Sequence, residues 1–234
     1  RWEAPQPMHT PRFVSGAAVL GGYLYVCGGF PEMGTSVQRY NPRKLSAAEK
    51  WWTPMPNLKR SRNYCAVVAL HRHLYVMGGH DGSQVWNSME RIAPSDNDHG
   101  AFEWVYSGMR QRRHTHAAVV LQNRIYICGG CTTLKSEDMN LDMARSAEVF
   151  SPGSHESAPL PQMVVARYSH AAAVVKDKVV VSGGGIPGKH QSVNSVEVYA
   201  PSVGCWALCP EMDMVGRRGA HLSLVAAGEL YVIG

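Results

Sequence analysis

The chain has 234 residues, of which 45% are hydrophobic, and carries 23 Lys and Arg against 18 Asp and Glu. This composition supports a buried core and excludes disordered, collagen-like and disulfide-scaffold chains. The formal charge of +5 is spread without a basic block, which argues against nucleic acid as the main partner. No apolar run reaches the roughly 18 residues that span a bilayer, and the first residues lack the core of a signal peptide. We therefore expect a cytoplasmic protein with no membrane partner.

Glycine pairs recur along the chain at intervals of 50, 51 and 54 residues, starting at Gly28, Gly78, Gly129 and Gly183. An arginine stands 16 residues before each first glycine, and another stands 16 residues before the final Gly234. These arginines are Arg12, Arg62, Arg113, Arg167 and Arg218. Such constant spacing is the signature of a repeat architecture.

Each repeat predicts four strands. Two apolar runs split by a short turn, such as 66–70 and 74–77, predict a hairpin of buried strands A and B. The alternating segment 88–94, Ser-Met-Glu-Arg-Ile-Ala-Pro, predicts strand C, which its proline ends. A tryptophan opens strand D at Trp104, and its equivalents are Trp2, Trp51 or Trp52, Ser157 and Trp206. Four strands in about 50 residues form one blade of a β-propeller.

The order of these features resembles the Kelch motif over essentially the whole chain. The second repeat, with Gly-Gly-His-Asp-Gly followed by Asn-Ser-Met-Glu-Arg, resembles the kelch-like (BTB-Kelch) family in particular. The resemblance implies an all-β Kelch propeller with four complete four-stranded blades and partial blades at both ends, part of a six-bladed ring. We predict one domain over 1–234, with units at 9–58, 59–109, 110–163 and 164–212 and a partial unit at 213–234.

Two motifs fit known chemical sites but have simpler explanations. Residues 183–189 match the Gly-x4-Gly-Lys spacing of a phosphate loop, but His190 replaces the Ser or Thr that would hold magnesium, and no helix pattern follows. Cys128 and Cys131 form a C-x-x-C pair without a second pair, and Cys128 occupies a strand position. We expect the glycines to allow the chain to bend at the end of strand B, and the cysteines to pack in the core.

Three histidines each lie three residues after a repeat arginine: His116, His170 and His221. Histidines from several blades could hold copper or zinc near the axis, as in oxidases that share the Kelch fold. Packing is the simpler explanation, because Ser15 and Cys65 occupy the equivalent positions. We therefore expect no enzyme, no catalytic residue, no cofactor and no bound metal, and keep a Kelch-type oxidase or sugar isomerase as an alternative.

The resemblance also implies a partner-binding face made by the B-to-C and D-to-A loops. Carried onto this chain, the family's contact positions are the serine before strand C, the residue after the glycine pair, and the arginine region of the D-to-A loop. The residues are Ser36, Ser88, Ser146, Ser195, Phe30, His80, Arg62, Arg113, Arg167 and Tyr64. An arginine fork binds a carboxylate in a bidentate way, which suggests an acidic partner segment. Because the arginines also recur as motif residues, a structural role stays open for each.

The third B-to-C loop, Cys131 to Arg145, is the longest, and we expect it to shape partner choice. The leading prediction is a protein–protein interaction module that recognises substrates as part of a BTB-Kelch adaptor for a cullin-RING ubiquitin ligase. The cullin-type ligase would be bound through a domain not present in this sequence. An actin or cytoskeletal scaffold is the second binding role. These functions follow from family analogy alone.

Overall fold

The computed structural model describes residues 7–30, 34–43, 50–94, 100–105, 108–135, 140–189 and 191–234. Four consecutive segments each form a four-stranded antiparallel sheet, and a last segment forms a two-stranded sheet. In every sheet neighbouring strands follow the chain order, so each complete blade runs A, B, C, D. The predicted all-β fold of repeated four-stranded blades is confirmed.

The strands have the following bounds. The first blade contains β1 (Gly16–Leu20), β2 (Tyr23–Cys27), β3 (Val37–Tyr40) and β4 (Trp52–Met55). The second contains β5 (Ala66–Leu70), β6 (His73–Met77), β7 (Met89–Ile92) and β8 (Glu103–Val105). The third contains β9 (Ala117–Leu121), β10 (Arg124–Cys128), β11 (Ala147–Ser151) and β12 (Glu156–Leu160). The fourth contains β13 (Ala171–Val175), β14 (Lys178–Ser182), β15 (Val196–Ala200) and β16 (Cys205–Leu208), and the partial sheet contains β17 (Leu222–Ala226) and β18 (Glu229–Ile233).

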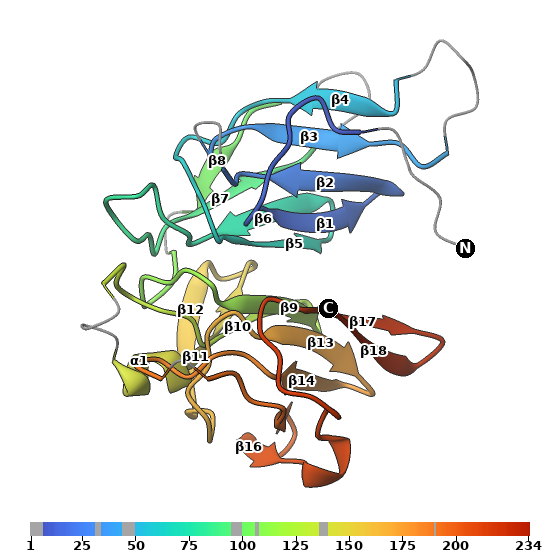
Figure 1. Cartoon of the computed structure of the whole chain (residues 1–234). Helices are drawn as coiled ribbons and strands as arrows, with labels where there is room; N and C mark the ends of the chain where they lie inside the picture. Colours follow the sequence, from blue (N-terminus) through green and yellow to red (C-terminus); the bar gives the residue numbers. More distant parts are fainter. Residues whose placement is uncertain are drawn as a thin grey trace.

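The first strand of each sheet contacts the first strand of the next, so that β1, β5, β9, β13 and β17 follow one another around an axis (Figure 1). Backbone hydrogen bonds connect these blades two residues after each repeat arginine. The N–H of Tyr64 donates to the Val14 carbonyl at 2.8 Å, and Thr115, Ser169 and Ala220 continue the series at 3.1, 2.8 and 2.7 Å. All five residues have φ between 50° and 55°. A chain of backbone bonds therefore joins successive blades.

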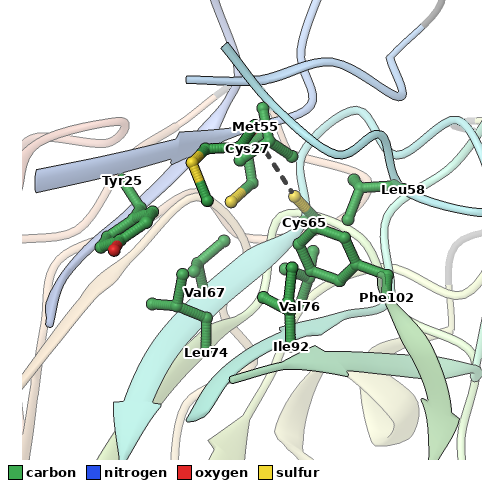
Figure 2. Packing of buried hydrophobic residues seen from close by; sticks show 11 residues of the cluster. Tyr25, Cys27, Met55, Leu58, Cys65, Val67, Leu74, Val76, Ile92 and Phe102 are labelled. Carbon is green, nitrogen blue, oxygen red and sulfur yellow. Dashed lines mark hydrogen bonds between the residues drawn. The ribbon is translucent and has the colours of Figure 1, made fainter. Parts of the chain in front are cut away.

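The core lies between the faces of adjacent blades. Figure 2 shows Tyr25 and Cys27 of the first blade against Cys65, Leu74 and Val76 of the second, all buried. The Cys65 thiol lies 3.8 Å from the Cys27 carbonyl oxygen, across the boundary between the blades. Because a middle strand is covered on both faces, it reads as a continuous apolar run rather than an alternating one. Burying each large apolar side chain contributes about 1.5–3 kcal/mol.

In the described part of the chain, two short helical segments interrupt the β structure, and neither was predicted from the sequence. The helix α1 (Leu141–Arg145) forms in the third B-to-C loop, where the Asn140 side chain caps it by accepting from the N–H groups of Asp142 and Met143. The 3-10 segment η2 spans Pro210–Met212. Among the described residues, no helix is long and apolar enough to cross a membrane. The strand predicted at Trp2 lies outside the described residues.

Candidate functional site

The repeat arginine of the second blade is enclosed by its own blade. Arg62 donates from Nε to Glu90 Oε1 at 2.9 Å and from Nη1 to the carbonyls of Gly78 and Ser88 at 2.7 and 2.9 Å. Its Nη2 donates to Ser88 Oγ at 2.8 Å. Neither side chain of the Arg62–Glu90 pair is exposed to solvent. One guanidinium thus joins the end of strand B to the start of strand C.

The next two blades repeat this ion pair. Arg113 donates to Glu148 at 3.0 Å and Arg167 to Glu197 at 3.0 Å, and all four side chains are buried. Burial lowers the pKa of the Arg167 guanidinium, and the adjacent Glu197 carboxylate opposes that shift. The charged fork is therefore held by its own blade's carboxylate and carbonyl groups.

This environment corrects the expected role of the three arginines. Arg62, Arg113 and Arg167 were expected to contact a partner, but each guanidinium is fully buried and presents no donor at the surface. The sequence left a structural role open for each arginine, and the contacts within the blades support that role. We therefore leave these arginines out of the candidate face.

The four predicted serines are half-buried and lie beside the repeat arginines. Ser36 Oγ accepts from Arg12 at 2.9 Å, and Ser195 Oγ accepts from Arg167 at 2.9 Å, as Ser88 does from Arg62. Ser146 differs, since its hydroxyl donates to the Met143 carbonyl in the last turn of α1. The serine hydroxyls are thus engaged within the blades, and contact between the serines and a partner stays a prediction.

Sequence reasoning missed the importance of the strand-C glutamates. Glu90 also accepts from the backbone N–H groups of Lys59 and Arg60, at 2.6 and 3.3 Å, so its carboxylate fixes the D-to-A loop as well as Arg62. Glu148 accepts from the Arg110 N–H at 2.6 Å. A glutamate two residues after each strand-C serine in three of the four units was the available signal, and Gln38 takes its place in the first unit.

Exposed aromatic side chains gather on the face formed by these loops. Phe13 is 61% exposed, and Phe30 and Tyr64 are each 39% exposed. The rings of Phe13 and Phe30 stack at 5.9 Å between centroids, and Tyr64 stacks on His80 at 5.6 Å. His114, which is itself buried, meets His80 edge-on at 5.2 Å and supports it from below the surface. We call Phe13, Phe30, Tyr64, His80 and His114 the aromatic patch.

The repeat explains why the loops that carry these side chains lie together. An isolated β-bridge pairs the residue after the repeat arginine with the residue after the glycine pair, as in Phe13 with Phe30 and His114 with Cys131. Each bridge therefore brings a D-to-A loop beside a B-to-C loop. Three predicted residues, Phe30, Tyr64 and His80, lie in the patch. Phe13 and His114 were missed, although each directly follows a repeat arginine.

The patch is uncharged at neutral pH. Burial lowers the pKa of His80, and the neighbouring His114 lowers it further. Burial also lowers the pKa of His114, which the hydrogen bond to the Thr133 carbonyl opposes. Since both imidazoles ordinarily titrate near pH 6.5, both are neutral near pH 7. The face thus presents aromatic surface rather than charge at this place.

Comparison with known proteins identifies the family. The family model of the Kelch motif matches residues 61–98, 112–164 and 166–213, which is more than half of the chain. The chain belongs to the Kelch-repeat family.

Other Kelch proteins resemble the chain over nearly its whole length. Human Kelch-like protein 23 is 24% identical over 218 residues, which cover 92% of this chain and 36% of that protein. Human Kelch-like protein 15 is 25% identical over all of this chain and 40% of its own length, and alpha-scruin of Limulus polyphemus is 26% identical over all of this chain and 28% of its own. The chain therefore spans well under half the length of these relatives.

A solved structure also resembles the Kelch fold seen here. The structure of YjhT matches with a TM-score of 0.77 at 16% identity, over 96% of this chain and 73% of that one. This likeness supports the fold alone.

The three repeated histidines of the Kelch blades, His116, His170 and His221, line a cavity of about 300 Å³. Ser15 and Cys65, at the equivalent positions of the first two blades, line it with them. Burial lowers the pKa of His170 to about 3 and that of His116 well below its ordinary value, with nearby arginines adding to both shifts. His116 packs tightly on the preceding blade, since a Cβ at Gly78 would lie 2.6 Å from its Cε1. His221 Nε2 lies 3.0 Å from Ser182 Oγ. Across the described ranges, no three His, Cys, Asp or Glu side chains are grouped to hold a metal ion.

The cysteines of this Kelch chain form no disulfide, since all six are free thiols. Cys128 is buried at the end of β10, and Cys131 is buried beyond the glycine pair. Burial raises the pKa of Cys128 to about 12 and that of Cys131 to about 11. Both sulfurs of the C-x-x-C pair are thus protonated near pH 7, as core residues are.

Proposed function

We propose that this Kelch chain is a protein–protein interaction domain that binds a segment of another protein on the face carrying the aromatic patch. The observation that carries the proposal is the exposure of Phe13, Phe30 and Tyr64 on adjoining loops. Aromatic side chains supply large contact areas at low entropic cost and dominate binding energy at interfaces. A gathering of them on a loop face marks a recognition surface.

The frame beneath the patch supports the same proposal. Glu90 and Glu148 hold the backbone of the D-to-A loops at Arg60 and Arg110, directly before the loop residues that reach the surface. Tyr64 is further fixed by its backbone bond to Val14. Loops that are already ordered lose little entropy when a partner binds, so more of the contact energy appears as affinity.

The resemblance to kelch-like proteins supports a more specific role. We infer that the domain selects substrates for a BTB-Kelch adaptor of a cullin-RING ubiquitin ligase, which would bind the ligase through a domain outside this sequence. A cytoplasmic location, no enzymatic activity, and no nucleic-acid or membrane partner belong to the same proposal. A cytoskeletal scaffold is the alternative role for the same face, and the partner's identity separates the two.

The experiment is affinity capture with the chain and with two variants. Phe13→Ser combined with Tyr64→Ser removes aromatic area from the patch at little cost to stability, because both side chains are exposed. The matched control is Val203→Ser, which alters a 72% exposed side chain in the β15–β16 turn, at the opposite ends of the strands. We expect the patch variant to bind the partner at least about tenfold more weakly than the unchanged chain does. The control should bind the partner with unchanged affinity. Equal capture by both variants would remove the proposed face.

The adaptor role has its own test. Depletion of the full-length protein should raise the abundance of a partner that depends on the patch, and inhibition of cullin activation should raise it equally. If neither treatment changes that partner's abundance, the adaptor role fails while the binding role stands.

A further inference from the structure

A basic pocket of about 370 Å³ lies on the loop face, between the second and third blades. Its lining includes three arginines, Arg60, Arg110 and Arg112, together with Trp86, Gln84 and Gln111. Two D-to-A loops contribute the arginines, and the B-to-C loop of the second blade contributes Trp86 and Gln84. The pocket is therefore built from the loops that also carry Tyr64, His80 and His114 of the aromatic patch.

The described residues provide no counter-charge for the arginines of this pocket. In the part of the chain that the structure describes, none of the three guanidinium groups forms an ion pair, and no Asp or Glu is among the lining residues. The buried Glu90 and Glu148 are already paired with Arg62 and Arg113. Asp81, in the nearby B-to-C loop, accepts hydrogen bonds from Ser83 and Gln84 within its own turn.

The arginine on one side of the pocket is held in place. The guanidinium carbon of Arg60 lies 4.3 Å from the ring centroid of Trp86 and 5.1 Å from that of Trp104. Stacking on the flat face of a guanidinium leaves its N–H edge free to bind an oxygen anion. The Arg60 and Arg110 backbones are anchored by Glu90 and Glu148, so the pocket is ordered before a ligand arrives.

The repeat shows that the fold does not need these arginines. In the fourth unit, the three residues before the repeat arginine are Val164, Val165 and Ala166. Glu197 accepts from the backbone N–H groups of Val164 and Val165 in the same way as Glu90 does from Lys59 and Arg60. The loop therefore forms equally well with apolar side chains.

We propose that the basic pocket binds an anionic side chain of the partner polypeptide, either a phosphorylated residue or two adjacent carboxylates. Arginine forks recognise phosphate and carboxylate oxygens through paired charge-assisted hydrogen bonds. The proposal rests on the proposed function, because the segment that fills the pocket is part of the partner on the aromatic patch. Arg60 precedes Tyr64 by four residues and Arg112 precedes His114 by two, so the same two D-to-A loops contribute to both features.

The test uses three fluorescein-labelled pools of degenerate peptides with a fixed centre: phosphoserine, Glu-Glu or serine. Binding is followed by fluorescence anisotropy with the chain, with R60Q/R110Q/R112Q, and with R124Q/K176Q/K178Q. The second variant removes the same charge from exposed residues in or directly after A-to-B turns, at the opposite ends of the strands. We expect one anionic pool to bind at least about tenfold more tightly than the serine pool, and only the pocket variant to lose this preference.

Equal losses in the two variants would show binding to net charge and overturn the proposal, as would equal binding of the three pools. A single-stranded oligonucleotide that displaces the peptides at lower concentration would also overturn it, in favour of nucleic acid. The anionic pool that binds more tightly shows whether the pocket prefers phosphate or carboxylate. If R60Q/R110Q/R112Q captures the natural partner normally while the Phe13→Ser, Tyr64→Ser variant does not, the pocket proposal fails and the proposed function stands.

Discussion

Glu90 on β7 accepts the Nε–H of Arg62 at 2.9 Å, at a place where neither side chain reaches solvent. The same carboxylate accepts the backbone N–H groups of Lys59 and Arg60. A single buried acid thus neutralises the repeat arginine and fixes the loop that carries the candidate site.

The substitution Glu90→Gln tests this dependence. Removing one partner of a buried ion pair leaves an uncompensated charge, so we expect the free energy of unfolding to fall by about 3 kcal/mol. The control is Glu103→Gln, because Glu103 pairs with Arg91 at 3.6 Å with 68% of its side chain exposed, and should cost at most about 1 kcal/mol. Urea midpoints at unchanged slope measure both effects. Similar losses in the two variants would contradict the structural role of the pair.

Much of the fold could be predicted because the repeat places every element several times. The apolar runs 66–70 and 74–77 became β5 and most of β6, and the segment 88–94 contains β7. The helix α1 was missed, since a five-residue helix capped by one asparagine carries no periodic signal.

The candidate site could be predicted only in part. Spacing showed that Arg62 recurs, but could not show whether its side chain turns into the blade or towards a partner. Phe30, Tyr64 and His80 were found because the resemblance marks repeated positions on the loops. Arg110 and Arg112 were missed because they belong to one inter-blade boundary rather than to the repeat.

The buried histidines predict a loss of stability in acid. His170 has a pKa of about 3 in the folded chain, against about 6.5 for an exposed imidazole. Between these values the unfolded chain binds a proton that the folded chain does not, so stability is lost as the pH falls through this window. Each such histidine contributes a slope of up to about 1.4 kcal/mol per pH unit.

Urea midpoints between about pH 7 and pH 5 measure this slope. The control variant is His170→Cys, which copies Cys65 of the second unit. It should lower the slope of the free energy of unfolding against pH by the contribution of about one proton. An unchanged slope in that variant would show that His170 titrates normally in the folded chain.

The cysteines should differ sharply in reactivity. Burial raises the pKa of Cys27, and raises that of Cys65 to about 11, so these thiols stay protonated and covered near pH 7. Cys205 is exposed. We expect a maleimide probe to label Cys205 rapidly and the buried thiols only after unfolding in guanidinium chloride, as followed by peptide mass spectrometry. Rapid labelling of Cys27 in the native chain would contradict the packing between the first two blades.

The backbone at Val14 offers a stabilising substitution. Val14 has φ of 54°, a left-handed conformation that costs a β-branched residue about 1–2 kcal/mol. Val14→Gly should therefore raise the free energy of unfolding by about 1 kcal/mol, while Val19→Gly, in the extended strand β1, should lower it. Thermal unfolding compares the two. A loss of stability in both variants would show that the Val14 side chain contributes more than its backbone costs.

Hydrogen–deuterium exchange of the chain alone and in complex with a captured partner reports directly which face the partner covers. We predict that binding slows exchange in the loop segments 59–64, 80–87 and 110–114, which carry the aromatic patch and the basic pocket. The turn 201–204, at the opposite ends of the strands, should exchange at the same rate in both states. Protection confined to that turn, with none in the three loop segments, would contradict the assignment of the loop face as the binding face.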